Sequence, residues 1–219
     1  MTINPLLMLK SVEKSYAIGQ RDVQVLRGVD LTVENGDFVV IQGQEGSGKS
    51  ALLNILAGIE RSSGGEVKID GKAIEADMSG LALLGSMVSF LSPVFCLDAR
   101  MTIHETLTQH NLVKNLPTWQ ALELAGIEAD DNRRICELDQ EMRRKVGTAR
   151  AFMARPRLIL ADLTPPPWGV PPSLESLEVA NRKLGSAIVV ASTQNVDIPQ
   201  SRVFHLKGGK MAPTTLATM

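Results

Sequence analysis

The stretch GQEGSGKS, residues 43–50, decides the fold because it fits the phosphate-binding pattern G-x-x-x-x-G-K-[ST] at every fixed position. An apolar run, FVVIQ (residues 38–42), precedes it, and the segment KSALLNILA (residues 49–57) follows with helical spacing that ends at Gly58. A strand, a glycine-rich loop and a helix in this order place backbone amides and a helix N-terminus around an anion. The sequence therefore predicts a binding site for a nucleoside triphosphate.

Each fixed position of residues 43–50, which we call the phosphate loop, has a physical role. Glycine lets the backbone curl until consecutive amides point inward, Lys49 adds a full positive charge, and the Ser50 hydroxyl reaches Mg²⁺. The other protein ligand of the cation should be an aspartate at the end of a buried strand, and Asp162 follows the run RLILA. We therefore expect ATP and Mg²⁺ as ligands. The expected nucleotide contacts are Gly43, Glu45, Gly46, Ser47, Gly48, Lys49, Ser50 and Ala51, and the expected Mg²⁺ ligands are Ser50 and Asp162.

The rest of the chain alternates between strand-like and helix-like patterns, as in an α/β protein. Two-residue periodicity before the phosphate loop predicts an antiparallel β edge, and compact apolar runs after it predict a parallel core sheet. Helical spacing over about residues 98–154, interrupted at Pro117, predicts a small helical subdomain. The expected strands, besides residues 38–42, are 9–16, 23–26, 31–33, 66–69, 87–90, 158–161, 187–191 and 203–206, and a further helix is expected at 174–184.

The composition excludes several classes of protein. Of the 219 residues, 44% are apolar and 21% are charged, which is typical of one globular domain rather than of a disordered or fibrous chain. With 23 basic and 24 acidic residues, the net charge of −1 gives no overall attraction for nucleic acid. A basic cluster in the helical part lacks aromatic residues for base stacking, so we interpret it as a solvated helix face. It comprises Arg143, Arg144, Lys145 and Arg150.

Cysteines, histidines and apolar segments predict no further site. The two cysteines lack the paired spacing of a zinc or redox motif and the three histidines are scattered, so all five are interpreted as ordinary residues. No apolar run approaches the roughly 18 residues of a membrane span, and the first residues lack the apolar region of a signal peptide. We therefore expect a cytoplasmic protein. The five residues are Cys96, Cys136, His104, His110 and His205.

Taken in order, these features resemble the ATP-binding cassette (ABC) ATPases, especially those that serve lipoprotein-release, macrolide-export and cell-division permeases. The resemblance implies one ABC ATPase-like, P-loop domain over residues 1–219, with a nucleotide-binding core of residues 1–95 and 155–219 around the helical subdomain. It is carried by residues 25–74 around the phosphate loop, by RMTIHETL (100–107), by KVGTARAFMARPRLILAD (145–162) and by SRVFHLKGGKM (201–211).

The resemblance also implies how the nucleotide and the partners are bound. Tyr16 is similar by position to the family's aromatic residue that stacks on adenine. Family members work as dimers beneath a membrane permease, so we expect a homodimer, or a heterodimer with another ABC ATPase, at the cytoplasmic face of the inner membrane. Coupling segments of the permease are expected to dock between the loop near residues 93–100 and the helical subdomain.

Two positions that the family uses for catalysis differ in this chain. Where the family carries LSGGQ, which grips the γ-phosphate bound to the opposing subunit, this chain has LDQEM (residues 138–142), whose two carboxylates would face a phosphate. After Asp162 the family places a glutamate that polarises the attacking water, whereas Leu163 cannot accept a proton. The chain therefore lacks a general base at the expected catalytic position.

Further departures concern the family's Q-loop, its switch histidine and the loop that crosses the dimer face. Because phosphoryl transfer depends on positioning and charge stabilisation, these losses favour nucleotide binding with little or no hydrolysis. The Q-loop glutamine aligns with Pro93 or Ser92, the switch histidine with Thr193 or Gln194, and the crossing loop with PPPWGVPP (residues 165–172).

This combination leaves alternative functions open. The first is a degenerate ABC subunit that binds MgATP and acts as a structural or regulatory component on an inner-membrane permease. The second is an active ATPase in which Glu141 or Glu137 substitutes as the base. The third is the inactive half of a heterodimer with an active ABC ATPase, which would clamp the nucleotide at Lys49 from the opposing side.

Overall fold

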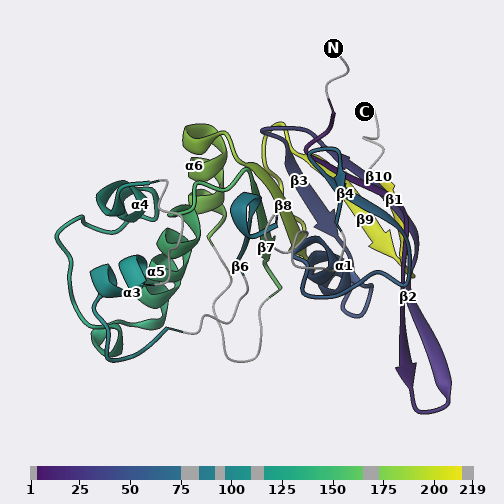
Figure 1. Ribbon diagram of the computed structural model, residues 1–219, viewed down its shortest axis with the longest axis horizontal. Coiled ribbons are helices and arrows are strands. Elements are labelled where there is room, and N and C mark those ends of the chain that lie inside the picture. The colour runs from purple at the N-terminus through teal and green to yellow at the C-terminus, as the bar shows by residue number, and fades with distance from the viewer. Residues whose placement is uncertain (1–3, 75–83, 92–96, 110–115, 165–172, 214–219) are drawn as a thin grey trace.

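The computed structural model describes residues 4–74, 84–91, 97–109, 116–164 and 173–213. Two β-sheets and a group of helices make up the fold (Figure 1). The first sheet is antiparallel, with the strand order β2-β1-β4-β5. Its strands are β1 (Leu7–Ile18), β2 (Arg21–Val33), β4 (Gly64–Ile69) and β5 (Lys72–Ala73).

The second sheet forms the centre of the molecule and has the strand order β10-β9-β3-β8-β7-β6. All of its neighbouring strands are parallel except β9 and β10, which form a closing hairpin. The expected α/β fold with an antiparallel edge and a largely parallel core sheet is confirmed. The strands are β3 (Phe38–Gln42), β6 (Val88–Leu91), β7 (Leu158–Asp162), β8 (Ala187–Ser192), β9 (Arg202–Lys207) and β10 (Lys210–Pro213).

Helices cover both faces of the central sheet. Helix α1 contacts β7 and β8 on one face and also contacts β2 of the antiparallel sheet. The helices that follow β6 gather beyond the other face, on the left in Figure 1, where α5 contacts α3 and α4. The helices are α1 (Lys49–Leu56), α3 (Ile103–Gln109), α4 (Thr118–Leu124), α5 (Gln140–Phe152) and α6 (Leu174–Leu184), with a 3₁₀ turn η1 at Ile135–Glu137.

The central strands belong to two hydrophobic cores at once. In β3, Val39 and Ile41 lie in the core shared with α1 and the antiparallel sheet, whereas Phe38 and Val40 lie in the core shared with the helices α3–α6. Strands β7 and β8 alternate in the same way, because successive side chains of a strand point to opposite faces. Strands buried on both faces explain why these segments appear in the sequence as unbroken apolar runs.

The antiparallel sheet corrects one sequence-based expectation. We predicted separate strands at 23–26 and 31–33, but β2 is continuous over 13 residues. Gly28 has a φ of 74°, a left-handed conformation that glycine adopts without steric cost, and it lies at a shift in the pairing with β1. The chain therefore bulges at this point and continues in the sheet. The strand expected at 87–90 is displaced by one residue, to 88–91.

The basic cluster of α5 is only in part the solvated face that we expected, because Arg143 is exposed whereas Arg144 is buried. Arg144 is only 8% exposed, because neighbouring elements cover α5 on several sides. The Arg143 guanidinium donates to the carbonyl oxygens of Ile135 and Cys136, and the Lys145 ammonium donates to the carbonyl oxygen of Gly126. These side chains therefore fasten α5 to the segments before it.

The described residues contain neither a membrane-spanning helix nor a metal-binding cluster. Within those residues, no helix is both long and apolar enough to cross a bilayer. The part of the chain that the structure describes also brings no three His, Cys, Asp or Glu side chains together as a metal-binding group. His104 lies on the surface with its Nε2 3.1 Å from the Ala129 carbonyl oxygen, and Cys136 is an exposed free thiol.

The burial of α5 against the central sheet leads to a prediction about stability. Phe152 is fully buried in the core of the helical side, so Phe152→Ala should lower the free energy of unfolding by about 3 to 5 kcal/mol. Urea denaturation measures this change. Trp119→Ala is the control, because Trp119 is 55% exposed on α4 and its loss should cost about 0.5 kcal/mol or less. Equal losses in the two variants would contradict the described packing.

Candidate nucleotide-binding site

The phosphate loop connects β3 to α1 and is held against the antiparallel sheet. Gly48 precedes the helix with a φ of 105°, and a Cβ atom at this position would lie 2.9 Å from Leu26 Cδ2 and 3.0 Å from the Val25 carbonyl oxygen. A larger residue would push the loop away from β2, so glycine is required here by both conformation and space. The N-terminus of α1 is therefore fixed at the carboxyl end of β3.

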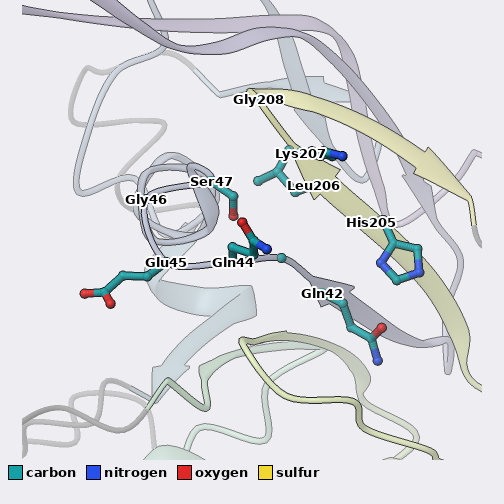
Figure 2. Close-up of a pocket in the computed structure, with 10 residues that line it drawn as sticks. Gln42, Gln44, Glu45, Gly46, Ser47, His205, Leu206, Lys207 and Gly208 are labelled. Atoms are coloured by element: carbon teal, nitrogen blue, oxygen red, sulfur yellow. The ribbon is translucent and has the colours of Figure 1, made fainter.

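A pocket of about 390 Å³ opens on one side of the loop, as Figure 2 shows. Residues 42–47 form one wall, and residues 205–208, at the end of β9 and in the turn that follows, form the other. His205 lies directly beside Gln42 in the parallel pairing of β9 with β3. The loop thus borders a space large enough to admit part of a ligand bound at its amides.

The Lys49 side chain lies inside the loop that precedes it. Only 5% of the residue is exposed, and its ammonium donates to the carbonyl oxygens of Gly43, at 2.7 Å, and Gln44, at 2.9 Å. Burial lowers the pKa of Lys49, while the negative charges of Asp162 and Glu45 act in the opposite direction. Since its hydrogen-bond partners are neutral, an anion bound here would stabilise the charged ammonium strongly.

Ser50 and Asp162 meet although they lie 112 positions apart in the sequence. Asp162 ends β7, is 8% exposed and accepts a hydrogen bond from the Ser50 hydroxyl, with 3.2 Å between Oγ and Oδ2. Its other carboxylate oxygen, Oδ1, accepts from the backbone N–H of Thr164 at 2.9 Å. A hydroxyl and a carboxylate at the mouth of a phosphate-binding loop are oxygen ligands that suit Mg²⁺. The donor set therefore fits a nucleoside triphosphate with its cation.

Tyr16 lies in β1, opposite Val23 of β2, and outside the residues that line the pocket. Its hydroxyl donates to Glu60 Oε2 at 2.6 Å, and the Lys14 ammonium lies 4.9 Å from the centre of its ring. Burial, followed by the hydrogen bond to Glu60 and its charge, raises the pKa of Tyr16 to about 12. The phenol therefore stays neutral over the physiological pH range.

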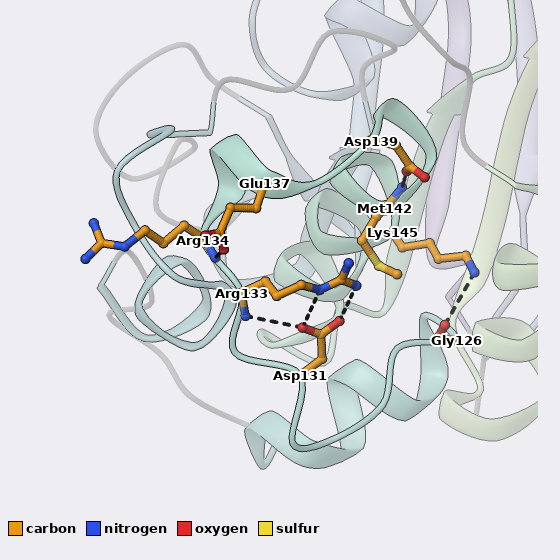
Figure 3. Close-up of polar contacts among 8 residues, drawn as sticks. All are labelled: Gly126, Asp131, Arg133, Arg134, Glu137, Asp139, Met142 and Lys145. Carbon is orange, nitrogen blue, oxygen red and sulfur yellow. Dashed lines mark hydrogen bonds and ion pairs between the residues drawn. The ribbon is translucent and has the colours of Figure 1, made fainter.

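The segment of residues 138–142 leads into α5 (Figure 3). Leu138 is buried, and Asp139 caps the helix by accepting a hydrogen bond from the Met142 backbone N–H at 2.7 Å. The Glu141 carboxylate is 3.8 Å from the Arg144 guanidinium and 3.7 Å from the Lys145 ammonium. The two carboxylates thus have separate partners within α5.

Leu163 is partly buried and packs against the core of the helical side. Its backbone N–H donates to the Ala191 carbonyl oxygen at 2.8 Å, which ties it to the neighbouring strand β8. Thr193 and Gln194, the positions aligned with the switch histidine, are exposed just after β8. The positions aligned with the Q-loop and the crossing loop, residues 92–93 and 165–172, lie outside the described residues.

Sequence reasoning missed several residues around the site. His205 was interpreted as an ordinary residue, yet it lines the pocket together with Lys207. Glu60 and Lys14, which contact Tyr16, were not singled out. The pairing of β9 with β3 and the approach of residue 60 to β1 depend on long-range contacts that leave no local pattern. The Asp139 cap had a local signal, because aspartate is a favoured residue immediately before a helix.

Comparisons with known proteins agree with the geometry. The family described as ABC transporter matches residues 26–163. The macrolide export ATP-binding/permease protein MacB of Chlorobium phaeobacteroides is 32% identical over 94% of this chain, which spans about a third (33%) of that protein's length. The lipoprotein-releasing system ATP-binding protein LolD of Alcanivorax borkumensis is 30% identical, over 86% of this chain and 88% of its own length.

Solved structures resemble the fold of this chain. The dimeric structure of MJ0796, a bacterial ABC transporter cassette, has a TM-score of 0.77 and 26% sequence identity, with coverage of 97% of this chain and 100% of that one. The dimeric post-hydrolysis state of the same cassette, bound to ADP and Pi, has a TM-score of 0.75. The motif, the fold and these similarities agree, and the chain therefore belongs to the ABC transporter family as an ATP-binding domain related to the MacB and LolD ATPases.

Proposed function

We propose that this chain binds MgATP at the phosphate loop, hydrolyses it slowly or not at all, and serves as a structural or regulatory component of a membrane transporter. One observation carries the proposal: the Lys49 and Ser50–Asp162 arrangement is complete, whereas the residue after Asp162 is an apolar leucine packed into a core. The residues for nucleotide binding are therefore retained, whereas the general base for hydrolysis is missing.

Nucleotide binding is supported by charge and shape at the loop. The buried Lys49 ammonium would gain a phosphate partner, and the Ser50 and Asp162 oxygens would hold the Mg²⁺ that accompanies the phosphates. We propose that the loop amides of residues 43–51 surround the phosphates and that Tyr16 stacks on the adenine.

Slow hydrolysis is supported by the surroundings of Leu163 and Asp139. A general base must accept a proton from water, which the Leu163 side chain cannot do. The Asp139 carboxylate accepts from the Met142 amide, so it occupies a donor at the N-terminus of α5 and adds negative charge there. A γ-phosphate approaching this helix end would therefore be repelled by the Asp139 carboxylate and would find the Met142 amide already bonded.

Assembly is proposed from the family relationship. We propose a homodimer, or a heterodimer with another ABC ATPase, beneath a permease at the cytoplasmic face of the inner membrane. The helical part, residues 98–154, is proposed as the subdomain that contacts the permease, and residues 1–95 and 155–219 as the nucleotide-binding core. The related MacB is a macrolide export ATP-binding/permease protein, which supports such a partnership.

The alternative of a working ATPase requires another base. Glu137 accepts a hydrogen bond from the Arg134 backbone N–H at 2.7 Å (Figure 3), and Glu141 pairs weakly with Arg144 and Lys145. Both carboxylates thus have local partners in the helical part. A heterodimer with an active sister subunit is the other alternative, and activity measurements separate the three.

The first prediction concerns nucleotide affinity. Lys49→Ala should weaken MgATP binding at least tenfold, because a charged contact in a partly desolvated site contributes about 1.5 to 3 kcal/mol. Isothermal titration calorimetry measures the change. Lys68→Ala is the control, since Lys68 forms a surface ion pair with Glu66 in β4. Equal affinity of Lys49→Ala and the parent would rule out the phosphate-loop assignment.

The second prediction concerns turnover. The purified chain should hydrolyse ATP no faster than its Lys49→Ala variant, because Leu163, which follows Asp162, cannot accept a proton from the attacking water. Steady-state phosphate release tests this. A Lys49-dependent rate would favour the active ATPase. A rate that needs a partner ATPase, and that disappears when the partner's own base is removed, would favour the heterodimer.

The third prediction concerns restoration of activity. A positioned general base contributes about 10² to 10⁴ in rate, yet Leu163→Glu alone should give almost no gain because charge stabilisation at the γ-phosphate is still missing. The gain in rate should be larger when Leu163→Glu is combined with a rebuilt segment at residues 138–142. Each variant is compared with its own Lys49→Ala control, and strong activity from Leu163→Glu alone would contradict this account of residues 138–142. The rebuilt segment carries Asp139→Ser, Gln140→Gly, Glu141→Gly and Met142→Gln.

A further inference from the structure

Exposed apolar side chains gather around Tyr16. Among the described residues, the large apolar side chains with the highest exposure are Ile18, at 64%, Ile59, at 62%, Trp119, at 55%, and Val23, at 43%. All except Trp119 lie next to Tyr16: Val23 pairs with it across the strands, Ile18 is two residues along the same strand, and Ile59 precedes its hydrogen-bond partner Glu60. We call Tyr16, Ile18, Val23 and Ile59 the apolar surface of the hairpin.

This surface lies on the side of the hairpin that faces the phosphate loop. The Val25 side chain would lie 3.2 Å from a Cβ atom at Gly48, so it points toward the loop. The Leu26 side chain points there as well, 2.9 Å from the same Cβ position, and Leu26 pairs with Lys14 of β1. Tyr16 is two residues beyond Lys14 on β1 and shares this face, at a spacing of about 7 Å. Tyr16 is directly opposite Val23, at about 5 Å. The ring is therefore near enough for one nucleotide to reach both the loop and the surface.

Glu60 fixes the orientation of the Tyr16 ring through both of its carboxylate oxygens. Oε2 accepts from the Tyr16 hydroxyl at 2.6 Å and lies 3.1 Å from the Lys14 ammonium. Oε1 accepts from the Asn54 side-chain amide at 2.8 Å. Asn54 belongs to α1, the helix that starts at the phosphate loop, so Glu60 connects the tyrosine to that helix. The hydrogen bond lowers the pKa of Glu60 and contributes to raising that of Tyr16, as expected for a neutral phenol on a carboxylate.

Lys14 covers one face of the Tyr16 ring. Its ammonium lies over the ring of Tyr16, 4.9 Å from the centroid, and donates to the Arg61 carbonyl oxygen at 2.8 Å. One face of the ring is thus covered by a cation that is itself held in place. A cation over one face attracts the π-electrons of the ring, and a base that stacks must use the other face.

We propose that Glu60 is a positioning residue for nucleobase binding: it holds the Tyr16 ring so that the face not covered by Lys14 stacks on the base. The apolar surface of the hairpin then borders that base. This proposal rests on nucleotide binding at the phosphate loop. Glu60 contacts the tyrosine hydroxyl and lies outside the phosphate loop, so its removal should affect only ligands that carry a base.

The experiment compares MgATP with magnesium tripolyphosphate, which has the phosphates but no base. Calorimetric affinities are measured for the parent, Glu60→Ala, Tyr16→Phe and the double variant. Glu60→Ala should weaken MgATP binding about fivefold or more and leave tripolyphosphate binding unchanged, because base stacking on an aromatic ring is a substantial part of nucleotide affinity. In the Tyr16→Phe background the effect of Glu60→Ala should largely disappear. Glu66→Ala, an exposed carboxylate of β4, is the matched control.

A spectroscopic measurement checks the hydrogen bond between Tyr16 and Glu60 independently. Tyr16 is the only tyrosine of the chain, so the phenolate absorbance reports on this residue alone. At about pH 10.5 an ordinary tyrosine is mostly ionised, whereas Tyr16 of the parent should remain mostly neutral. Glu60→Ala should ionise at a lower pH than the parent, and circular dichroism at the same pH confirms that both remain folded.

The outcomes distinguish this proposal from the function on which it rests. Equal weakening of MgATP and tripolyphosphate by Glu60→Ala, or an undiminished effect in the Tyr16→Phe background, would overturn the positioning role and leave nucleotide binding intact. Equal affinity of the parent for the two ligands would also overturn it, because the base would then contribute nothing. Absence of Lys49-dependent binding of either ligand would overturn the proposed function and this inference together.

Discussion

The enclosure of one ammonium group by its own loop is the interaction on which the site depends. The Lys49 side chain turns back to the carbonyl oxygens of Gly43 and Gln44, so the positive charge is buried among neutral dipoles. Gly48 makes this possible by bringing the loop against β2, which also fixes the start of α1. A buried charge with incomplete compensation favours an anionic ligand, and the neighbouring oxygens of Ser50 and Asp162 supply the place for its cation.

The acidic residues at the start of α5 have a structural role in the free chain. Asp139 satisfies an amide donor of the helix, a contact that stabilises a protein by typically about 1 kcal/mol. Replacing an aspartate cap with serine retains capping while removing the charge, so capping by itself does not require aspartate. The negative charge at this helix end is therefore a property of this chain beyond the needs of its fold, which agrees with the proposal of slow or absent hydrolysis.

The sequence predicted those parts of the fold and site that depend on local patterns. The phosphate loop, β3 and α1 follow from a motif and an apolar run, and the meeting of Ser50 with Asp162 follows because parallel strands end at one edge of a sheet. The burial of Arg144 could not be predicted, because a charged residue indicates solvent unless the neighbours of its helix are known. The contact of Glu60 with Tyr16 joins positions 44 residues apart and has no signature in either segment.

The alternation of side chains in β3, β7 and β8 has a mechanical consequence. Each of these strands contributes side chains to both cores. Bending the sheet toward one core would therefore disturb the packing of the other core. A change at the phosphate loop would therefore affect the packing of both cores through the strands that they share. The side chains on the two faces of the sheet have little room to rearrange, because close-packed interiors contain few cavities.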